Sequence, residues 1–286
     1  MSIKLEHLSH QYSQNSASSR YAIEDINLTI EKGEFIGLIG HTGSGKSTLI
    51  QHLNGLLKAT GGSYTFDGED VYAENYNMKK LRSKVGMSFQ YPEHQLFEVT
   101  VLKDVCFGPM NMGLTEDEAI IESKKALEAV GLSEEYYEKS PFELSGGQKR
   151  RVAIAGVLAM NPEYFILDEP TAGLDPVGRD RILNLIYELH RERNMTIILV
   201  SHSMEDVARF AKRLLVMNQG HLMFDAPPVE VFRHKKELEE MGLSAPETSY
   251  VMEELHKRGF SVDLDAITME QARDSILQAV KGGKAL

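Results

Sequence analysis

The chain has 286 residues, enough for one large domain or two smaller ones with a sizeable core. Acidic residues outnumber basic ones by 42 to 31, so the net charge of −11 disfavours a general attraction to nucleic acid or anionic lipid. No apolar run approaches the roughly 20 residues of a membrane-spanning helix, and the N-terminus lacks the pattern of a secretory signal. A single cysteine excludes an intramolecular disulfide, so we expect a soluble protein of the reducing cytosol.

Alternating apolar residues predict β-strands in the first part of the chain. Ile26–Ile30 places every second side chain on one apolar face. Tyr64–Phe66 repeats the alternation before Asp67-Gly68, a hairpin turn signal. The polar stretch Ser13–Ser19 predicts an exposed loop between two such strands. We therefore expect an antiparallel β subdomain here.

From Phe35 onward, short apolar runs alternate with helical patterns. The runs are Phe35–Ile39, Val85–Phe89, Tyr164–Leu167 and Thr196–Val200. Continuous apolar runs of this length are typical of parallel strands that are buried on both faces. The pattern predicts an α/β fold with a mostly parallel core sheet.

Two further regions differ from this core in their pattern. A helix-rich insertion at about residues 95–160 separates two of the apolar runs, and within it Thr115 and Glu118 predict a helix start with a capping box. The end of the chain is helical and charged. We expect one domain over residues 1–230 and a small helical extension over residues 231–286.

The first chemical motif is GHTGSGKS at Gly40–Ser47, which fits the phosphate-loop pattern G-x-x-x-x-G-K-[ST]. A buried strand runs into it, and an apolar-periodic helix leaves it as far as Leu57. The glycines let backbone N–H groups point at phosphate oxygens, and the helix N-terminus adds partial positive charge. We expect Lys46 to reach the β- and γ-phosphates and Ser47 to bind Mg²⁺. The expected nucleotide-binding residues are Gly40, Thr42, Gly43, Ser44, Gly45, Lys46, Ser47 and Thr48.

The second motif is a pair of carboxylates, Asp168 and Glu169, at the end of the apolar run Tyr164–Leu167. Ligands of open parallel sheets bind at the carboxyl ends of the strands. We expect Asp168 to hold Mg²⁺ through its water shell and Glu169 to polarise the attacking water. A solvated acidic turn is the alternative, and the phosphate loop in the same chain makes that alternative weak.

The third motif is LSGGQ at Leu144–Gln148, which opens a helix and predicts a second anion site. A chain with two phosphate-binding helix starts suggests that the second one serves a nucleotide held by another molecule. The basic run Lys149–Arg151 follows directly. This run is either a solvated helix face or a contact near the phosphates of a partner.

Taken in order, GHTGSGKS, LSGGQ and ILDEP resemble the ATP-binding cassette of ABC transporters over essentially residues 3–230. The resemblance implies a phosphate-loop NTPase fold with a RecA-like core sheet, an antiparallel β subdomain and a helical signature subdomain. It also implies ATP and Mg²⁺ as cofactors, with two cassettes that sandwich two ATP molecules head to tail. The residues that would then serve the ATP held mainly by the partner are Ser145, Gly146, Gly147 and Gln148.

The remaining motifs of that family are also present. The resemblance implies that Gln90 contacts Mg²⁺ or water and reports to the membrane subunits. His202 matches the switch histidine that contacts the γ-phosphate, and Ala172–Asp175 matches the D-loop at the dimer seam. Tyr12 matches the aromatic residue that stacks on adenine, with Tyr21 as a competitor across the loop.

Two stretches narrow the resemblance. Phe89–Phe97 (FQYPEHQLF) and Ala155–Met160 (AGVLAM) are similar to the ATPases of energy-coupling factor importers, and Phe97–Asp104 is most like the second of their two ATPases. This implies three partners: a similar ATPase, a transmembrane coupling subunit and a substrate-binding membrane subunit. It also implies a peripheral location on the cytoplasmic face of the membrane and a vitamin or metal ion as cargo. The C-terminal extension would contact the partner ATPase.

Two other functions remain open. The ATPase of an ordinary ABC importer is the nearest alternative, and the two stretches just quoted argue against it. Cassette proteins of DNA repair or translation typically carry tandem cassettes or a coiled-coil arm, whereas this chain has one cassette and no heptad arm. We therefore expect an ATPase that couples hydrolysis to transport, without a nucleic-acid partner.

Overall fold

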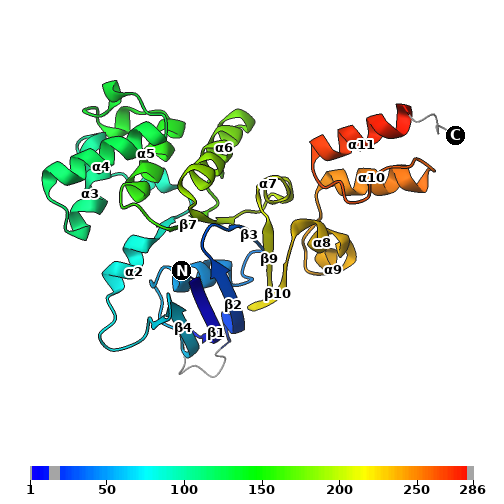
Figure 1. The fold of residues 1–286 in the computed structure, drawn as a ribbon, viewed down its shortest axis with the longest axis horizontal. Helices are drawn as coiled ribbons and strands as arrows, with labels where there is room; N and C mark the ends of the chain where they lie inside the picture. Colours follow the sequence, from blue (N-terminus) through cyan, green and yellow to red (C-terminus); the bar gives the residue numbers. More distant parts are fainter. Residues whose placement is uncertain (1, 13–19, 282–286) are drawn as a thin grey trace.

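The computed structural model describes residues 2–12 and 20–281, so the loop expected at 13–19 lies outside the described residues. Two sheets lie at the centre, a helical lobe lies on one side, and a pair of C-terminal helices extends on the other (Figure 1). This arrangement confirms the expected fold class, a parallel-rich core with an antiparallel subdomain and helices.

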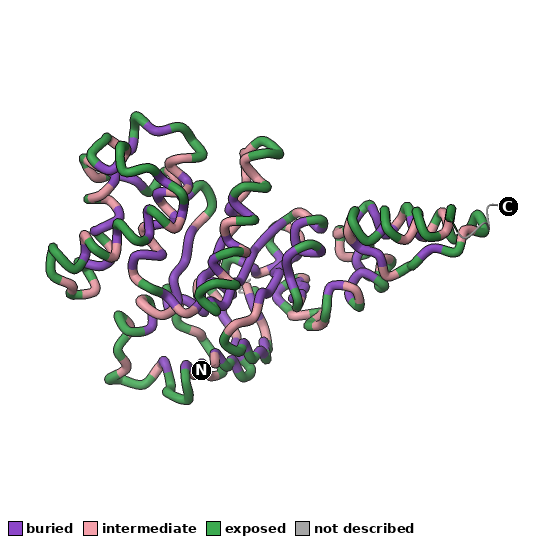
Figure 2. The backbone as a smooth tube through the Cα atoms, turned by 45° about the horizontal axis from the view of Figure 1, so that its top comes forward, coloured by how far each residue is buried: buried purple, intermediate pink, exposed green. Residues whose placement is uncertain are grey.

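The six-stranded sheet has the order β10-β9-β3-β8-β7-β6 and is parallel except for the β9–β10 hairpin. Its strands are β3 (Phe35–Ile39), β6 (Val85–Ser88), β7 (Tyr164–Asp168), β8 (Thr196–Val200), β9 (Arg213–Asn218) and β10 (His221–Ala226). Every residue of β3 and β8 is buried, and the strands form the buried centre of the molecule (Figure 2). All four predicted apolar runs are therefore confirmed as strands, and the run from Val85 ends one residue earlier than expected.

The two faces of this sheet pack into two separate apolar clusters. In β8, Ile197 and Leu199 face the cluster that contains the helical lobe, whereas Ile198 and Val200 face the cluster built with the antiparallel sheet. Successive side chains of a strand point to opposite faces. Because both faces are covered, an alternating polar pattern is absent from these strands and the continuous apolar runs result.

The antiparallel sheet has the order β2-β1-β4-β5. Its strands are β1 (Ser2–His10), β2 (Ile23–Glu31), β4 (Gly61–Phe66) and β5 (Glu69–Asp70). Asp67 and Gly68 join β4 to β5 with φ values of 53° and 81°, the left-handed pair of a tight hairpin turn. The hairpin predicted from Asp67-Gly68 is confirmed.

Four helices flank the sheets: α1 (Lys46–Leu53), α2 (Met78–Lys84), α6 (Pro176–Arg193) and α7 (Met204–Phe210). The prediction that this helix runs to Leu57 was wrong by four residues, because α1 ends at Leu53. Asn54 caps it while its side-chain amide donates to the carbonyl of Val85, and Gly55 has a φ of 71°. A left-handed glycine stops an α-helix.

The helical lobe lies between β6 and β7 in sequence. It contains η1 (Pro92–Gln95), α3 (Val101–Met112), α4 (Glu116–Ala129), η2 (Glu134–Tyr136), η3 (Pro141–Glu143) and α5 (Gly146–Leu158). The capping box predicted from Thr115 and Glu118 is confirmed at the start of α4. Leu127 and Leu158 belong to the same apolar cluster as β7, so the lobe is packed onto the core sheet rather than separate from it.

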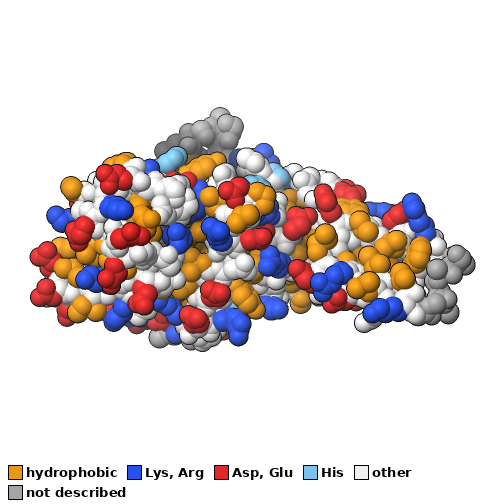
Figure 3. Space-filling view, turned by 90° about the horizontal axis from the view of Figure 1, so that it is seen from above, with side chains coloured by type: hydrophobic (Ala, Val, Ile, Leu, Met, Phe, Trp, Pro, Cys, Tyr) orange, Lys and Arg blue, Asp and Glu red, His pale blue; other side chains and the backbone are white. Residues whose placement is uncertain are grey.

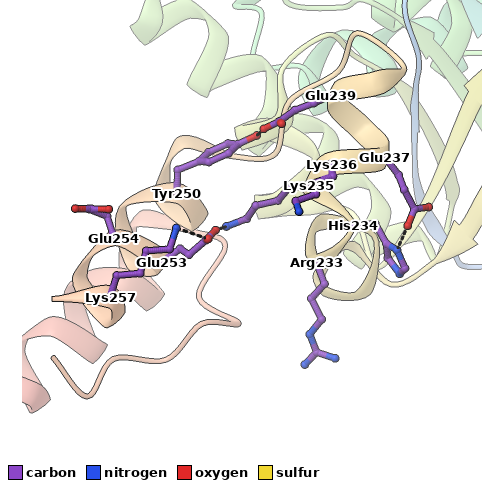
Figure 4. A pocket seen from close by; sticks show the side chains of 10 residues that line it. All are labelled: Arg233, His234, Lys235, Lys236, Glu237, Glu239, Tyr250, Glu253, Glu254 and Lys257. Atoms are coloured by element: carbon purple, nitrogen blue, oxygen red, sulfur yellow. Dashed lines mark hydrogen bonds and ion pairs between the residues drawn. The ribbon is translucent and has the colours of Figure 1, made fainter. Parts of the chain in front are cut away.

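The C-terminal helices are α8 (Pro228–Arg233), α9 (Lys235–Glu240), α10 (Glu247–Lys257) and α11 (Met269–Lys281). Phe232 and Leu238 join the main core, whereas α10 and α11 share a small cluster of their own around Met252. A charged cleft lies where α9 meets α10, and there the ammonium of Lys235 lies 2.7 Å from the carboxylate of Glu253 (Figure 4). No helix in the described part of the chain could cross a lipid bilayer.

Candidate nucleotide-binding site

The phosphate loop joins the carboxyl end of β3 to the start of α1. Gly40 has a φ of 156°, and a Cβ there would lie 2.4 Å from the carbonyl oxygen of Met217. Gly45 has a φ of 105°, and a Cβ there would lie 2.7 Å from the carbonyl oxygen of Ala22. Such contacts cannot be accommodated, so both positions require glycine. The tight curl that the motif predicted is therefore present.

The start of α1 is left open to an anion. Its N-cap is Gly45, which supplies no side-chain acceptor for the first N–H groups of the helix. These N–H groups have no partner within the helix. The Ser44 hydroxyl is fully buried and lacks a hydrogen-bond partner in the described structure. Backbone donors and a helix dipole at one point form the usual site for a phosphate.

Lys46 is buried at the centre of this loop. Its ammonium donates to the carbonyl of Gly40 at 2.6 Å and to that of His41 at 3.1 Å. Burial lowers the pKa of Lys46, and the nearby carboxylates of Glu169 and Asp168 oppose that shift. The lysine thus carries its charge on the inner side of the loop, facing the acidic pair.

Asp168 and Glu169 follow the last buried residues of β7, at the same sheet edge as the phosphate loop. Burial raises the pKa of Asp168, and Lys46 partly offsets the rise. The backbone of Glu169 is left-handed, with a φ of 50°, and its N–H donates to the carbonyl of Val200 at 3.1 Å. A non-glycine residue held in this region is strained and often functional.

The carboxyl group of Glu169 is held in an unusual environment. Its pKa is raised to about 7, first by burial and then by the charge of Asp168. The Nε2 atom of His202 lies 3.2 Å from its Oε1 atom, but Oε1 has no hydrogen bond of good geometry within the described residues. Partial burial of the half-exposed ring and the charge of Lys46 lower the pKa of His202. A carboxyl group that titrates near neutral pH suits a general base.

His202 and Gln90 lie at the same edge as the acidic pair. His202 follows β8 and Gln90 follows β6, the two strands that pair with β7 on either side. Both residues are exposed, and within the described residues the Gln90 side chain makes no hydrogen bond or ion pair. The parallel topology therefore collects Lys46, Glu169 and His202 beside one another, with Gln90 at the next strand end.

Tyr12 lies beside the first turn of α1. Its hydroxyl is 3.0 Å from that of Thr48, and its ring meets the ring of His10 edge-on at 4.8 Å between centroids. The side chain is nevertheless 64% exposed. An aromatic ring that is anchored at one end and open on a face can stack on a base. Tyr21, its competitor in sequence, is also exposed.

The LSGGQ motif at Leu144–Gln148, called the signature from here on, is placed differently. Ser145 caps α5, and its hydroxyl and backbone N–H both donate to the side-chain oxygen of Gln148 at 2.9 Å. Gly146 and Gly147 are exposed, with open space where a Cβ would lie. The groove beside these residues is lined from α4 and α6, and no residue of the phosphate loop lines it. One chain thus brings together the phosphate loop and the acidic pair but not the signature.

Sequence reasoning missed the role of one residue in the basic run Lys149–Arg151. Arg150 is 1% exposed, so the interpretation of this run as a solvated face was wrong for its central residue. Its guanidinium pairs with the carboxylate of Glu93 and donates to the carbonyls of Pro170 and Ala172. The only signal in the sequence was an arginine five positions after Ser145 on the apolar side of α5, which is too weak to predict burial.

Comparison with known proteins identifies the family to which this chain belongs. The family model for ABC transporters matches residues 23–172. The energy-coupling factor transporter ATP-binding protein EcfA2 of Clostridium tetani is 56% identical, with 97% of each chain covered, and that of Clostridium perfringens is 52% identical over 98% of this chain and 99% of its own.

Solved structures agree with the sequence relatives. The structure of cbiO1 from Clostridium perfringens, described as part of the ABC transporter complex cbiONQ, has a TM-score of 0.74 at 39% identity and covers 88% of this chain and 98% of its own. The ATP-binding cassette MJ0796, in a dimeric post-hydrolysis state with ADP and Pi, has a TM-score of 0.70 at 29% identity over 79% of this chain and 98% of its own. The chain belongs to the ABC transporter family of ATP-hydrolysing cassettes, among the ATP-binding subunits of energy-coupling factor transporters.

Proposed function

We propose that this protein binds and hydrolyses ATP to power the uptake of a vitamin or metal ion by a membrane-embedded energy-coupling factor transporter. The observation that carries the proposal is the gathering of Lys46, Asp168, Glu169 and His202 at one sheet edge, where the charge of Lys46 acts on the pKa of the other three. The match to relatives named as transporter ATP-binding proteins supports the transport part of the proposal.

The phosphates would lie against the open start of α1, and the adenine would stack on the exposed ring of Tyr12. Lys46 would exchange its bonds to the Gly40 and His41 carbonyls for bonds to phosphate oxygens. Thr42 and Gly43 are exposed, and a Cβ added at Gly43 would meet open space. This leaves the loop free to close over a ligand.

The residues at this edge fit a magnesium ion. Ser47, Gln90 and Asp168 offer a hydroxyl, an amide and a carboxylate oxygen, which are the hard ligands that Mg²⁺ prefers. Within the described residues, no hydrogen bond occupies the carboxylate of Asp168, and Lys46 helps to keep it ionised. When bound, Mg²⁺ would neutralise charge on the phosphates, with Asp168 holding it through water.

Glu169 would accept a proton from the attacking water, and His202 would hold the γ-phosphate beside it. Both roles require the two side chains to lie close together, and His202 Nε2 lies 3.2 Å from Glu169 Oε1. The buried position of Glu169 raises its pKa into the range where a carboxylate is an effective base at neutral pH. Hydrolysis would then be limited to molecules in which the nucleotide is fully enclosed.

The enclosing partner would be a similar ATPase that contributes its own signature. Gly146, Gly147 and the Ser145–Gln148 pair face outward, as residues for an ATP held by another subunit must. The D-loop at Ala172–Asp175 would lie at the same seam. A transmembrane coupling subunit and a substrate-binding subunit would complete the assembly, with this chain on the cytoplasmic face of the membrane.

The extension over residues 231–286 would contact the partner ATPase. Figure 3 shows hydrophobic side chains gathered over the C-terminal helices. Val251, Met269, Leu277 and Val280 are each about half exposed or more, although they lie on helices that pack together. Exposed apolar side chains in such a small module are typical of a subunit contact.

The test of the proposed chemistry is Glu169→Gln. The variant keeps the shape of the site but cannot accept a proton, so it should bind ATP normally and hold a closed dimer with its partner ATPase. Sedimentation with and without ATP, together with phosphate release, measures both effects. Full turnover by the variant would overturn the role of Glu169.

The alternatives differ in the partners they require. Purification from detergent extracts, followed by mass spectrometry, should recover a second ATPase and membrane proteins if the chain serves an energy-coupling factor transporter. Recovery of nucleic acid or ribosomes would favour the classes that act in DNA repair or translation. Recovery of an external binding protein would favour an ordinary ABC importer.

A further inference from the structure

Arg150 is the largest side chain in the described structure that is almost fully buried. It lies in the first turns of α5, five positions after Ser145. Burial of a guanidinium is costly unless its N–H groups are all paired. Four of its five N–H groups donate hydrogen bonds, and all the acceptors lie outside α5.

Two of those bonds go to the segment after Gln90. The Nε atom donates to Glu93 Oε2 at 3.0 Å, and Nη2 donates to Glu93 Oε1 at 2.6 Å. Burial raises the pKa of the Glu93 carboxyl, but the bonds from Arg150 outweigh burial and keep the pKa below its ordinary value. A bidentate pair of this kind fixes direction as well as distance.

The other two bonds go to the turn after Glu169. Nη1 donates to the carbonyl of Pro170 at 3.0 Å and to that of Ala172 at 2.9 Å. The N–H of Ala172 in turn donates to the carbonyl of Glu169 at 3.1 Å. Arg150 therefore binds the carbonyls of this turn, and the Glu169 carbonyl binds its N–H at Ala172.

This turn fixes the strained backbone of Glu169. A left-handed residue with a side chain persists only where its surroundings over-determine it. The bonds to Val200 and Ala172 fix its N–H and its carbonyl, and Arg150 immobilises the chain that bears Ala172. Loss of Arg150 would remove its bonds to two carbonyls and to the Glu93 carboxylate and would release the turn.

We propose that Arg150 is a positioning residue for hydrolysis, which ties the signature helix, the segment after Gln90 and the turn after Glu169 into one unit. Movement of the signature or of the segment after Gln90 then reaches Glu169 through one guanidinium. The inference rests on the proposed role of Glu169 as the base. It places the control of that base on α5, outside the nucleotide pocket.

The first test is Arg150→Lys in the full chain, purified with its partner subunits. Lysine can pair with Glu93 but cannot also reach the two carbonyls, because it lacks the planar fork. We expect kcat for ATP hydrolysis to fall at least about tenfold, while ATP binding changes by less than about twofold. Equal losses in binding and in kcat would overturn the proposal.

A matched control separates positioning from stability. Arg213 also pairs with a carboxylate in bidentate fashion, Asp225, and donates to a carbonyl, that of Thr29, at the far end of the core sheet. Arg213→Lys should lower Tm about as much as Arg150→Lys and leave kcat unchanged. If both variants lose the same activity, Arg150 acts only through stability.

A charge-free variant tests whether a low kcat comes only from leaving an unpaired buried charge. Arg150→Met combined with Glu93→Leu removes the buried pair without leaving a lone charge, so Tm should recover towards that of the parent protein. We expect kcat to stay low, because the carbonyls of Pro170 and Ala172 remain unheld. Recovery of kcat with Tm would overturn the proposal.

Hydrogen exchange gives a readout that does not depend on Glu169 as the base. Peptides that cover residues 169–174 should exchange faster in the charge-free variant, whereas peptides over α1 should not change. Uniformly faster exchange would contradict a local role. If Glu169→Gln retains full turnover, the role of Glu169 fails, and the exchange data still decide whether Arg150 holds the turn.

Discussion

The N-termini of α1 and α5 both match phosphate-binding patterns, but they are completed in different ways. α1 begins at a left-handed glycine without a side-chain cap, and its loop is buried around Lys46. α5 begins with a capping box in which Ser145 and Gln148 satisfy each other, and its glycines are exposed. The first keeps free donors within one chain, whereas under the proposed function the second would exchange its internal bonds for contacts with ATP held by a partner subunit.

This difference separates the two helix starts by what each would contribute: α1 to nucleotide binding within one chain, and α5 to the assembly of two subunits. A helix start that keeps its N–H groups free retains donors whose partner must be a ligand. A helix start that caps itself is stable in a single chain, at the cost of a weaker intrinsic pull on an anion. Substitutions at the two sites should therefore affect different measurements.

The largest expected effect follows Lys46→Ala. The variant removes a charged donor from the phosphate loop, so ATP affinity of the isolated chain should fall at least about thirtyfold, which corresponds to the ~2 kcal/mol or more of a charged hydrogen bond. Fluorescent nucleotide titration measures this. Lys125→Ala, at an exposed ion pair with Glu122 in the helical lobe, should leave affinity unchanged. Equal affinity for both variants would remove Lys46 from the site.

The next effect compares the glycines of the two helix starts. Gly45→Ala forces a side chain into left-handed backbone and against the carbonyl of Ala22, so the free energy of unfolding should fall by about 2 kcal/mol. Gly147→Ala meets open space and should not lower stability, yet it should impair hydrolysis in the assembled complex. Thermal unfolding of the isolated chain distinguishes them, and equal destabilisation would contradict the comparison.

A smaller effect is the pH dependence of hydrolysis. Glu169 must be ionised to accept a proton, and its pKa is about 7 in the folded chain. Protonation increases as pH falls, so kcat/KM should decrease below pH 7, by about tenfold per unit once the carboxyl is mostly protonated. Initial rates between pH 5.5 and 8.5 measure the profile. A rate that is flat down to pH 5.5 would mean that Glu169 does not act as the base.

The smallest effect is expected at the two capping boxes. Ser145→Ala and Thr115→Ala each remove an N-cap from the helical lobe and should each lower stability by about 1 kcal/mol. Only Ser145→Ala should also reduce hydrolysis in the complex, since Thr115 is far from the signature in sequence and caps α4. Chemical denaturation and phosphate release measure the two effects. Parallel losses of activity would assign the Ser145 effect to the helix alone.

Much of the fold could be predicted because its strands are buried on both faces. Phe35–Ile39 and Thr196–Val200 were predicted with the bounds that the structure has, since a strand between two apolar layers leaves an uninterrupted apolar run. The end of α1 was not predictable in the same way. Leu57 continues the helical periodicity, and the helix stops earlier because Asn54 bonds to β6 and Gly55 turns left-handed.

The sequence by itself determined where the phosphate loop, the acidic pair and the glycine-rich signature lie along the chain, because each of them is a local pattern of few residues. Tertiary structure alone decided that Arg150 is buried. Its acceptors at Glu93, Pro170 and Ala172 lie 57, 20 and 22 residues away along the chain. Periodicity within a helix reports which face is apolar, but it cannot report that distant turns place a carboxylate and two carbonyls around one guanidinium.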